Sequence, residues 1–370
     1  MGTVNRRLLK QGERIRVMIV DDSAVIRRLV TRALEQDPML QVVGSAPNGA
    51  IGLQRIPELD PHVVTLDIEM PDMNGLEMLR IIRRDHPLLR VIMLSTLTER
   101  GAAITVEALT LGADDYVTKV SQGGSFAGSM SNLQEEMIPK IKQFFRSPEQ
   151  NGPAQGEVSA YGLAKAFDSE GFLALQNKTR PKVLLLGVST GGPTALSCIL
   201  PQLPADFPLP VLVVQHMPPL FTRLLAERLN SSCPLSVEEA SQGCRVESGK
   251  VLIAPGDFHM MVALNAGSVQ VCLDQSPRQN FCRPAVDALF VSAAQVYGGA
   301  VLAGVLTGMG QDGLRGAGVL KARGATILAQ DEASSVVWGM PGAVVKAGFS
   351  DCVLPLNRVG AEIVRISGRA

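Results

Sequence analysis

The strongest constraint on the fold is the alternation of short apolar runs with amphipathic segments. In the first part of the chain, β-branched runs at residues 15–20, 40–44, 62–66, 90–94 and 115–118 are separated by segments of helical periodicity. Five strand–helix units predict a parallel sheet with helices on both faces. The first helix is predicted at residues 23–36, with Ser23 as its N-cap. Its apolar face comprises six residues: Val25, Ile26, Leu29, Val30, Ala33 and Leu34.

A second α/β pattern follows, with strands expected at residues 183–188, 210–214, 250–254, 300–306 and 326–329. Continuous apolar runs such as 183–188 are typical of a sheet that is covered on both faces. The stretch between the two patterns is rich in Ser, Gln, Gly and Ala without sustained periodicity. We therefore expect two doubly wound α/β domains at 15–146 and 180–368, joined by a linker at 147–179 with a short helix near 163–167.

Charge and cysteine usage exclude several classes of protein. Lys plus Arg and Asp plus Glu both number 35, so no overall field attracts nucleic acid or an anionic membrane. The six cysteines form no C-x-x-C pair and no His lies at zinc-ligand spacing from them. Residues 1–16 are basic but lack the apolar core of a secretion signal, and the apolar stretch 300–309 is too short for a bilayer. These features favour a cytoplasmic protein with reduced thiols and no membrane insertion.

In the first domain, chemistry-bearing residues stand where predicted strands end. Asp21 and Asp22 follow the first strand, Asp67 and Ser95 follow the third and fourth, and Lys119 follows the fifth. The carboxyl ends of parallel strands open on one edge of a sheet, where ligands bind. Clustered carboxylates there suit a hard cation such as Mg²⁺, and a carboxylate can also attack phosphorus to form an aspartyl phosphate. The alternative is that Asp residues at strand ends only cap the helices that follow.

Four motifs in this domain give a resemblance to a known family. V-D-D-S at 20–23, L-D-I-E-M-P-D-M-N-G at 66–75, M-L-S-T at 93–96 and G-A-D-D-Y-V-T-K at 112–119 resemble a bacterial response-regulator receiver domain, which has a flavodoxin-like fold. The resemblance implies six roles: Asp67 as phosphoacceptor, Asp22 as Mg²⁺ ligand with Asp21 beside it, Ser95 and Lys119 as switch residues, and Tyr116 as the rotating aromatic. One departure is Val120, where the family usually has a proline, so the peptide bond after Lys119 is expected to be trans.

The second domain contains a candidate nucleophile. G-V-S-T-G at 187–191 matches G-x-S-x-G, in which small residues allow a sharp strand-to-helix turn that exposes the serine, here Ser189. The N–H groups of the following helix would lie near an oxyanion formed there. Serine before a glycine-rich turn is also common as a helix N-cap or in a phosphate-binding loop, and both alternatives stay open.

A serine nucleophile needs a base, and the chain has four histidines. We expect His62 and His86 to be structural. His259 stands at a strand-to-turn junction where it would line a cleft. His216 directly follows a predicted strand and would emerge beside Ser189 if the two strands are neighbours. Its alternative role is that of a hydrogen-bonded loop histidine.

The base in turn needs an orienting carboxylate. Asp312 lies in the glycine-rich stretch L-T-G-M-G-Q-D-G at 306–313, after the strongest strand of this domain, and is the best-placed acid. Asp257 near His259 and Asp287 in a predicted helix are the other candidates. An Asp beside Gly is often only a turn residue.

Six motifs of this domain resemble the protein-glutamate methylesterase (CheB) family. They are G-V-S-T-G-G-P-T-A-L at 187–196, Q-H-M-P at 215–218, A-P-G-D-F-H-M at 254–260, R-P-A-V-D at 283–287, L-T-G-M-G-Q-D-G at 306–313 and Q-D-E-A-S-S-V-V-W-G-M-P at 330–341. The resemblance implies five roles: Ser189 as nucleophile, His216 as base and acid, Asp312 as orienter, and Thr190 and Met309 at the oxyanion site. Cys282 departs from the His or other polar residue expected before Arg283, and we expect it to change the cleft wall without touching the triad.

The combined resemblance implies demethylation of glutamate methyl esters and deamidation of glutamines on methyl-accepting chemotaxis receptors. It further implies a chemotaxis histidine kinase as phosphodonor, Mg²⁺ for the receiver only, no cofactor for hydrolysis, and a cytoplasmic protein recruited to receptor arrays. We hypothesise that the unphosphorylated receiver inhibits the esterase. Three rivals are a DNA-binding regulator, a non-catalytic scaffold, and a similar hydrolase serving an array outside motility; the first needs a basic recognition helix that the second domain lacks.

Overall fold

The computed structural model describes residues 9–10, 12–96, 98–119, 126–145 and 179–368, with only the backbone at 126–132. The chain divides near residue 154 into two compact units, and each is described by itself. The linker, the helix expected at 163–167 and Val120 lie outside the described residues.

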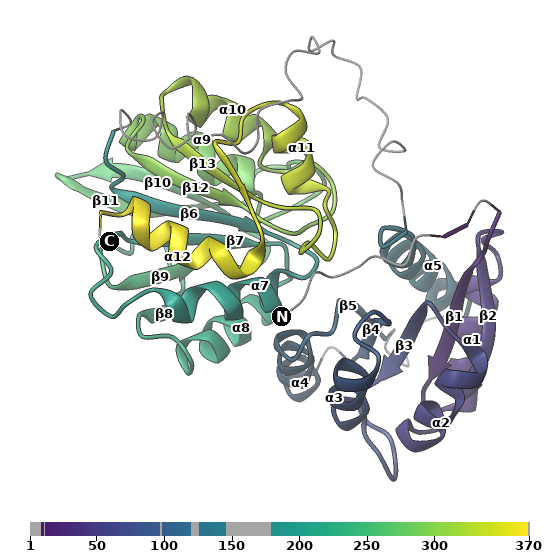
Figure 1. Cartoon of the computed structure of the whole chain (residues 1–370). Coiled ribbons are helices and arrows are strands. Elements are labelled where there is room, and N and C mark those ends of the chain that lie inside the picture. The colour runs from purple at the N-terminus through teal and green to yellow at the C-terminus, as the bar shows by residue number, and fades with distance from the viewer. Residues whose placement is uncertain (1–8, 11, 97, 120–125, 146–178, 369–370) are drawn as a thin grey trace. The chain divides into compact units, whose positions relative to one another are not determined.

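The first unit is a five-stranded parallel sheet in the order β2-β1-β3-β4-β5. Its strands and helices alternate along the chain: β1 (Ile15–Val20), α1 (Ala24–Leu34), β2 (Leu40–Ala46), α2 (Gly49–Leu59), β3 (Val63–Asp67), α3 (Gly75–Asp85), β4 (Arg90–Ser95), α4 (Glu99–Thr110), β5 (Asp115–Thr118) and α5 (Phe126–Lys142). Every residue of β3 and β4 is buried, because helices cover both faces of the sheet (Figure 1). The predicted five-strand parallel sheet is confirmed.

Helix α1 begins as expected, because the Ser23 hydroxyl accepts the N–H of Ile26 at 3.4 Å. Its expected apolar face was one residue too wide. Leu29 is buried, whereas Val25 is 67% exposed. Periodicity assigns Val25 to the apolar face of the helix but does not tell which turns of that face are covered, so it overstated burial at Val25.

The second unit is a seven-stranded parallel sheet in the order β14-β13-β12-β6-β7-β9-β8. Its elements in chain order are β6 (Val183–Val188), α7 (Gly192–Ile199), the 3₁₀ turn η2 (Leu200–Gln202), β7 (Val211–Gln215), α8 (Phe221–Asn230), β8 (Ser236–Glu239), β9 (Lys250–Ile253), β10 (His259–Asn265), β11 (Ser268–Asp274), α9 (Val286–Tyr297), β12 (Val301–Val305), α10 (Leu314–Ala322), β13 (Thr326–Gln330), α11 (Met340–Lys346), β14 (Cys352–Leu354) and α12 (Leu356–Ile366). In Figure 1, α7, α8 and α12 cover one face, and α9 and α10 cover the other. The doubly wound α/β class is confirmed.

The chain starts this sheet in the middle, at β6, builds outward through β7, and then crosses to β12 on the other side of β6. The carboxyl edge beside such a reversal of strand order is where ligands bind in open α/β sheets. The structure therefore places the loops after β6, β7 and β12 together at one edge.

Four strands of this unit were not predicted. The short edge strands β8 and β14 each pair on one side only, and β10 and β11 form a separate antiparallel hairpin. Edge strands carry weak apolar patterns because solvent reaches one side, so their sequences do not predict them.

Candidate active site

Ser189 is the first residue after β6, at the start of the turn into α7. Its backbone is held by three hydrogen bonds: its N–H donates to the Thr307 carbonyl at 3.0 Å, and its own carbonyl accepts from the Gly192 N–H at 2.7 Å and the Gln215 amide at 3.1 Å. Gly191, not Ser189, occupies the N-cap position of α7. The turn needs glycine there, because φ is +78° and an added Cβ would lie 2.6 Å from Val336. The N-cap alternative for Ser189 is therefore wrong.

His216 is the first residue after β7, the strand that pairs with β6. Its N–H donates to the Val188 carbonyl at 3.2 Å, so the two strand ends bring Ser189 and His216 to neighbouring positions. The Nε2 atom of the ring lies 2.8 Å from Oδ2 of Asp312. Within the described ranges the Ser189 hydroxyl makes no hydrogen bond to this ring.

Asp312 is 1% exposed and is anchored on both carboxylate oxygens. Besides His216, it accepts hydrogen bonds from four donors: the backbone N–H groups of Val286, Asp287 and Gly313 at 2.7–3.1 Å, and the Asn280 side-chain amide at 3.1 Å. Burial alone would raise the pKa of this carboxyl, but the His216 ring and the backbone donors outweigh it and lower the pKa. The structure thus fixes Asp312 as a charged acceptor pointing at His216.

The other Asp and His candidates do not form such a pair. His259 is fully buried, with Nε2 lying 3.2 Å from the Pro277 carbonyl, so the expectation that it lines a cleft was wrong. Asp257 makes an ion pair with Arg283 at 2.6 Å. His62 and His86 are structural, as expected: one accepts the Arg16 N–H from inside the first unit, and the other caps α3.

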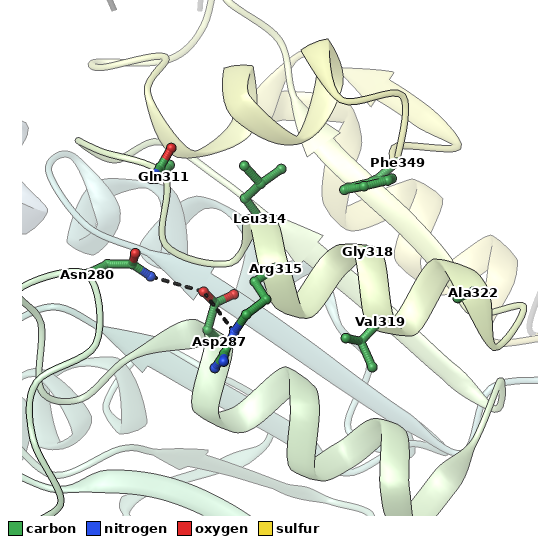
Figure 2. Close-up of a pocket in the computed structure, with 9 residues that line it drawn as sticks. All are labelled: Asn280, Asp287, Gln311, Leu314, Arg315, Gly318, Val319, Ala322 and Phe349. Carbon is green, nitrogen blue, oxygen red and sulfur yellow. Dashed lines mark hydrogen bonds and ion pairs between the residues drawn. The ribbon is translucent and has the colours of Figure 1, made fainter. Parts of the chain in front are cut away.

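Asp287 lies behind Asp312, at the end of a cavity of about 450 Å³ beside α10. Figure 2 shows the Asn280 amide and the Arg315 guanidinium both pointing toward its carboxylate, with distances of 3.0 and 3.8 Å. Because Asn280 donates to both Asp287 and Asp312, it ties the two carboxylates together. Burial, and then the nearby Asp312 charge, raise the pKa of Asp287.

Cys282 contacts the candidate triad directly, which corrects the expectation that it would not. Its Sγ lies 3.5 Å from His216 Nδ1, the ring nitrogen that faces away from Asp312. Burial lowers the pKa of His216, but Asp312 first and Cys282 second outweigh it and raise that pKa to about 9. A cysteine in the position of an expected polar residue was visible in the sequence, but its contact partner was not.

Thr190 follows Ser189 in the chain, and Gly308, the residue before Met309, passes against Ser189. The Thr190 carbonyl accepts the Thr307 hydroxyl at 2.9 Å, which joins the loop after β6 to the loop after β12. Met309 is 39% exposed and follows Gly308, where an added Cβ would lie 2.7 Å from the Ser189 Cβ. The loop after β12 therefore passes in contact with the serine.

The first unit holds a second cluster at its carboxyl edge. The Lys119 ammonium lies 2.9 Å from Asp21 and 2.7 Å from Asp67, and carboxylate oxygens of Asp21, Asp22 and Asp67 lie within 4.8 Å of one another. Burial first, together with the Asp21 charge, raises the pKa of Asp67 to about 6 despite Lys119. Burial would lower the pKa of Lys119, but the two carboxylates outweigh it and raise that pKa.

Ser95, an expected switch residue, and Tyr116, the expected rotating aromatic, are both buried. The Ser95 hydroxyl donates to the Thr96 carbonyl at 3.1 Å and accepts from the Thr105 hydroxyl at 2.5 Å. Tyr116 is 8% exposed and lies beneath the Lys140 ammonium, 4.8 Å from the ring centroid. The Thr105 and Lys140 contacts could not be predicted from local pattern, because both side chains come from helices that pack against the sheet.

Comparison with known proteins assigns the family of the chain. Residues 184–363 match the family described as CheB methylesterase, and residues 17–126 match the response regulator receiver domain. The chain is 44% identical to a protein from Trichodesmium erythraeum named protein-glutamate methylesterase/protein-glutamine glutaminase, over 96% of this chain and 99% of that protein. It belongs to this methylesterase family. A Thermotoga maritima protein of the same name is 42% identical, over 95% of this chain and 98% of the relative.

A solved structure of the methylesterase family is similar to the second unit. The crystal structure of the Thermotoga maritima CheB methylesterase catalytic domain is 45% identical, covers 51% of this chain and 100% of that chain, and has a TM-score of 0.50.

The rival of a DNA-binding second domain is set aside, because the methylesterase match occupies that part of the chain. Among the helices of the described residues, none has the length and hydropathy of a membrane span.

Proposed function

We propose that the chain hydrolyses glutamate methyl esters on methyl-accepting chemotaxis receptors, releasing methanol, and deamidates glutamines on the same receptors. The observation that carries this proposal is the charged, anchored Asp312 at 2.8 Å from His216, next to Ser189 at the carboxyl edge of the sheet. A protein in which this site were only a scaffold would have no need of a carboxylate desolvated to 1% exposure and aimed at a histidine.

The triad assigns a separate role to each ring nitrogen of His216. Nε2–H donates to Asp312, so the neutral ring keeps its lone pair on Nδ1. Nδ1 takes the Ser189 proton as Oγ attacks the carbonyl carbon, and the charge moves to the carbonyl oxygen on the side of Thr190 and Met309. Nδ1 then gives the proton to the leaving oxygen, the C–O bond breaks and methanol departs; with an amide, ammonia departs instead. Water hydrolyses the acyl-enzyme through the same nitrogen.

We propose that Asp67 of the first unit accepts a phosphoryl group from a chemotaxis histidine kinase. The donor set of Asp21, Asp22 and Asp67 consists of hard carboxylate oxygens and fits Mg²⁺, which these residues would hold and which would neutralise phosphoryl charge. Lys119, between two carboxylates, is placed to pair with a phosphoryl oxygen, and Ser95 would donate to another after rotating away from Thr96.

We further propose the division into a receiver at 15–146, a linker at 147–179 and a catalytic domain at 180–368, with inhibition by the unphosphorylated receiver. Recruitment to receptor arrays follows from the proposed substrate. The inhibition is tested by removing residues 1–179, which should raise the esterase rate above that of the unphosphorylated full chain. An unchanged or lower rate would contradict it.

The experiment that tests the function is methanol release from methyl-labelled receptor membranes. Wild type and Ser189→Ala are compared, each with and without a small phosphodonor and Mg²⁺. We expect release by wild type, faster release with phosphodonor, and none above background with Ser189→Ala. Release by Ser189→Ala at the wild-type rate would refute the assigned nucleophile, and no release by wild type would refute the substrate.

A further inference from the structure

Residues 279–282 form a tight turn in which Phe281 is an unusual residue. Gln279 and Cys282 exchange both backbone hydrogen bonds, at 3.0 and 2.8 Å, and the two central residues have positive φ, +50° at Asn280 and +64° at Phe281. Such a turn has the backbone signs of type I′, for which Asn followed by Gly is the favoured pair. Asn280 fits this preference. Phe281 stands where glycine is favoured, so its Cβ is held in a strained conformation.

The Phe281 ring makes little contribution to the stability of the fold that would offset this backbone strain. It is 94% exposed, the most exposed of the large hydrophobic side chains in the described ranges. A single exposed apolar residue is ordinary on a protein surface. A phenylalanine that is both exposed and confined to a left-handed conformation is unusual. The left-handed conformation favours glycine or asparagine, and an exposed position more often carries a polar side chain.

The residues on both sides of Phe281 contact the catalytic groups. Asn280 donates to Asp312 at 3.1 Å, and the Cys282 thiol lies 3.5 Å from His216 Nδ1. Gln279 accepts from Arg315 of α10 at 2.8 Å. Phe281 is therefore presented at a fixed position, one residue away from a side chain that touches the base.

We infer that Phe281 is a specificity-determining residue that packs against an apolar side chain next to the modified glutamate on the receptor protein. This inference rests on the proposed function. A rigid, exposed aromatic beside the catalytic groups is the kind of side chain that supplies binding energy in protein–protein contacts, because it loses little entropy when it is buried. The ester group itself needs only the triad and the oxyanion site, so the ring acts on protein substrates and not on small esters.

The test compares the full chain as wild type, Phe281→Gly and Leu264→Ala with two substrates. Leu264 is the matched control, because it is a 66% exposed hydrophobic residue at the end of the separate β10–β11 hairpin. The substrates are methylated receptor membranes and a small soluble ester, p-nitrophenyl acetate. We expect Phe281→Gly to raise KM for receptor membranes about tenfold or more at nearly unchanged kcat, and to leave small-ester hydrolysis within about twofold of wild type.

Thermal unfolding of the same variants separates recognition from a structural role. Glycine relieves the strain at this position, so the midpoint of Phe281→Gly should not fall below that of wild type. Three results would overturn the inference: an unchanged KM for membranes, an equal loss with the small ester, or a lower unfolding midpoint. If wild type itself released no methanol from membranes while hydrolysing the small ester, the proposed receptor substrate would fail, and this inference with it.

Discussion

The ion pair between His216 and Asp312 predicts the pH dependence of the esterase. The general base acts only as the neutral imidazole, and its pKa is raised from the ordinary 6.5 to about 9. That rise corresponds to about 3 kcal/mol of preference for the charged ring, so only about 1% of His216 is neutral at pH 7. We expect kcat/KM for methanol release to climb with pH up to about 9. Chemical ester hydrolysis, measured with Ser189→Ala, is subtracted at each pH.

Replacing Asp312 by Asn removes the charge that holds the proton on the ring. The rising limb of the pH profile should move down toward 6.5, because burial alone lowers the pKa of His216. The plateau rate should fall by a factor on the order of 10³–10⁴, since an amide no longer holds Nε2–H toward Asp312 and Nδ1 toward the serine. A lower pH limb together with a lower plateau rate distinguishes this role from simple loss of folded protein, which would lower the rate and leave the limb in place.

A second variant, Cys282→Ala, tests the same pKa shift in case Asp312→Asn fails to fold. Asp312→Asn also turns an amide N–H₂ toward backbone donors, whereas Cys282→Ala leaves every hydrogen bond of Asp312 in place. Cys282 also raises the pKa of His216, so its removal should move the limb in the same direction. The reasoning is refuted if Asp312→Asn keeps the wild-type limb, or if the wild-type rate is flat between pH 7 and 9.

Three further predictions concern the receiver and the active-site thiol. Asp67→Asn should abolish acceleration by phosphodonor and Mg²⁺ while keeping the basal rate; equal acceleration in both proteins would exclude Asp67 as the acceptor. Burial raises the pKa of Asp67 to about 6 in the folded receiver. The stability that Asp67 contributes is therefore present below pH 3.8 and is lost as the pH rises through 6. Asp67→Asn should raise the receiver's unfolding midpoint at pH 7.5 and lose this advantage below pH 4. Iodoacetamide should inactivate wild type and Cys272→Ala alike but spare Cys282→Ala, because alkylation of Cys282 blocks His216 Nδ1; inactivation of all three would place the sensitive group elsewhere.

Much of the fold followed from local pattern. The bounds of β1, β5 and β6 agree with the predicted runs. For the interior strands β1 and β6 the reason is that strands covered on both faces are apolar along most of their length and are followed here by polar residues. The missed strands β8 and β14 are short edge strands, and the β10–β11 hairpin lies outside the main sheet. The strands β8 and β14 are only four and three residues long, too short for a local pattern to identify, so pairing alone distinguishes them.

The candidate site could likewise be predicted in part from the sequence. The residue types and their places after strands identified Ser189, His216 and Asp67, since parallel strands deliver whatever follows them to a common edge. Asp312 was also favoured over Asp257 and Asp287 by its place in the glycine-rich stretch after a strand. Its contacts with His216 and Val286 join segments about 25 to 100 residues apart, which no local pattern records.

The sequence by itself determined two α/β sheets, the strand ends that carry chemistry and the family to which these motifs point. Only the tertiary structure decided which nitrogen of His216 faces Asp312, that Cys282 occupies the other side of the ring, and that Phe281 stands strained and exposed beside them. The physical reason is that element formation depends on periodic burial within a short window, whereas side-chain contacts and pKa values depend on distances between loops that only the assembled sheet brings together.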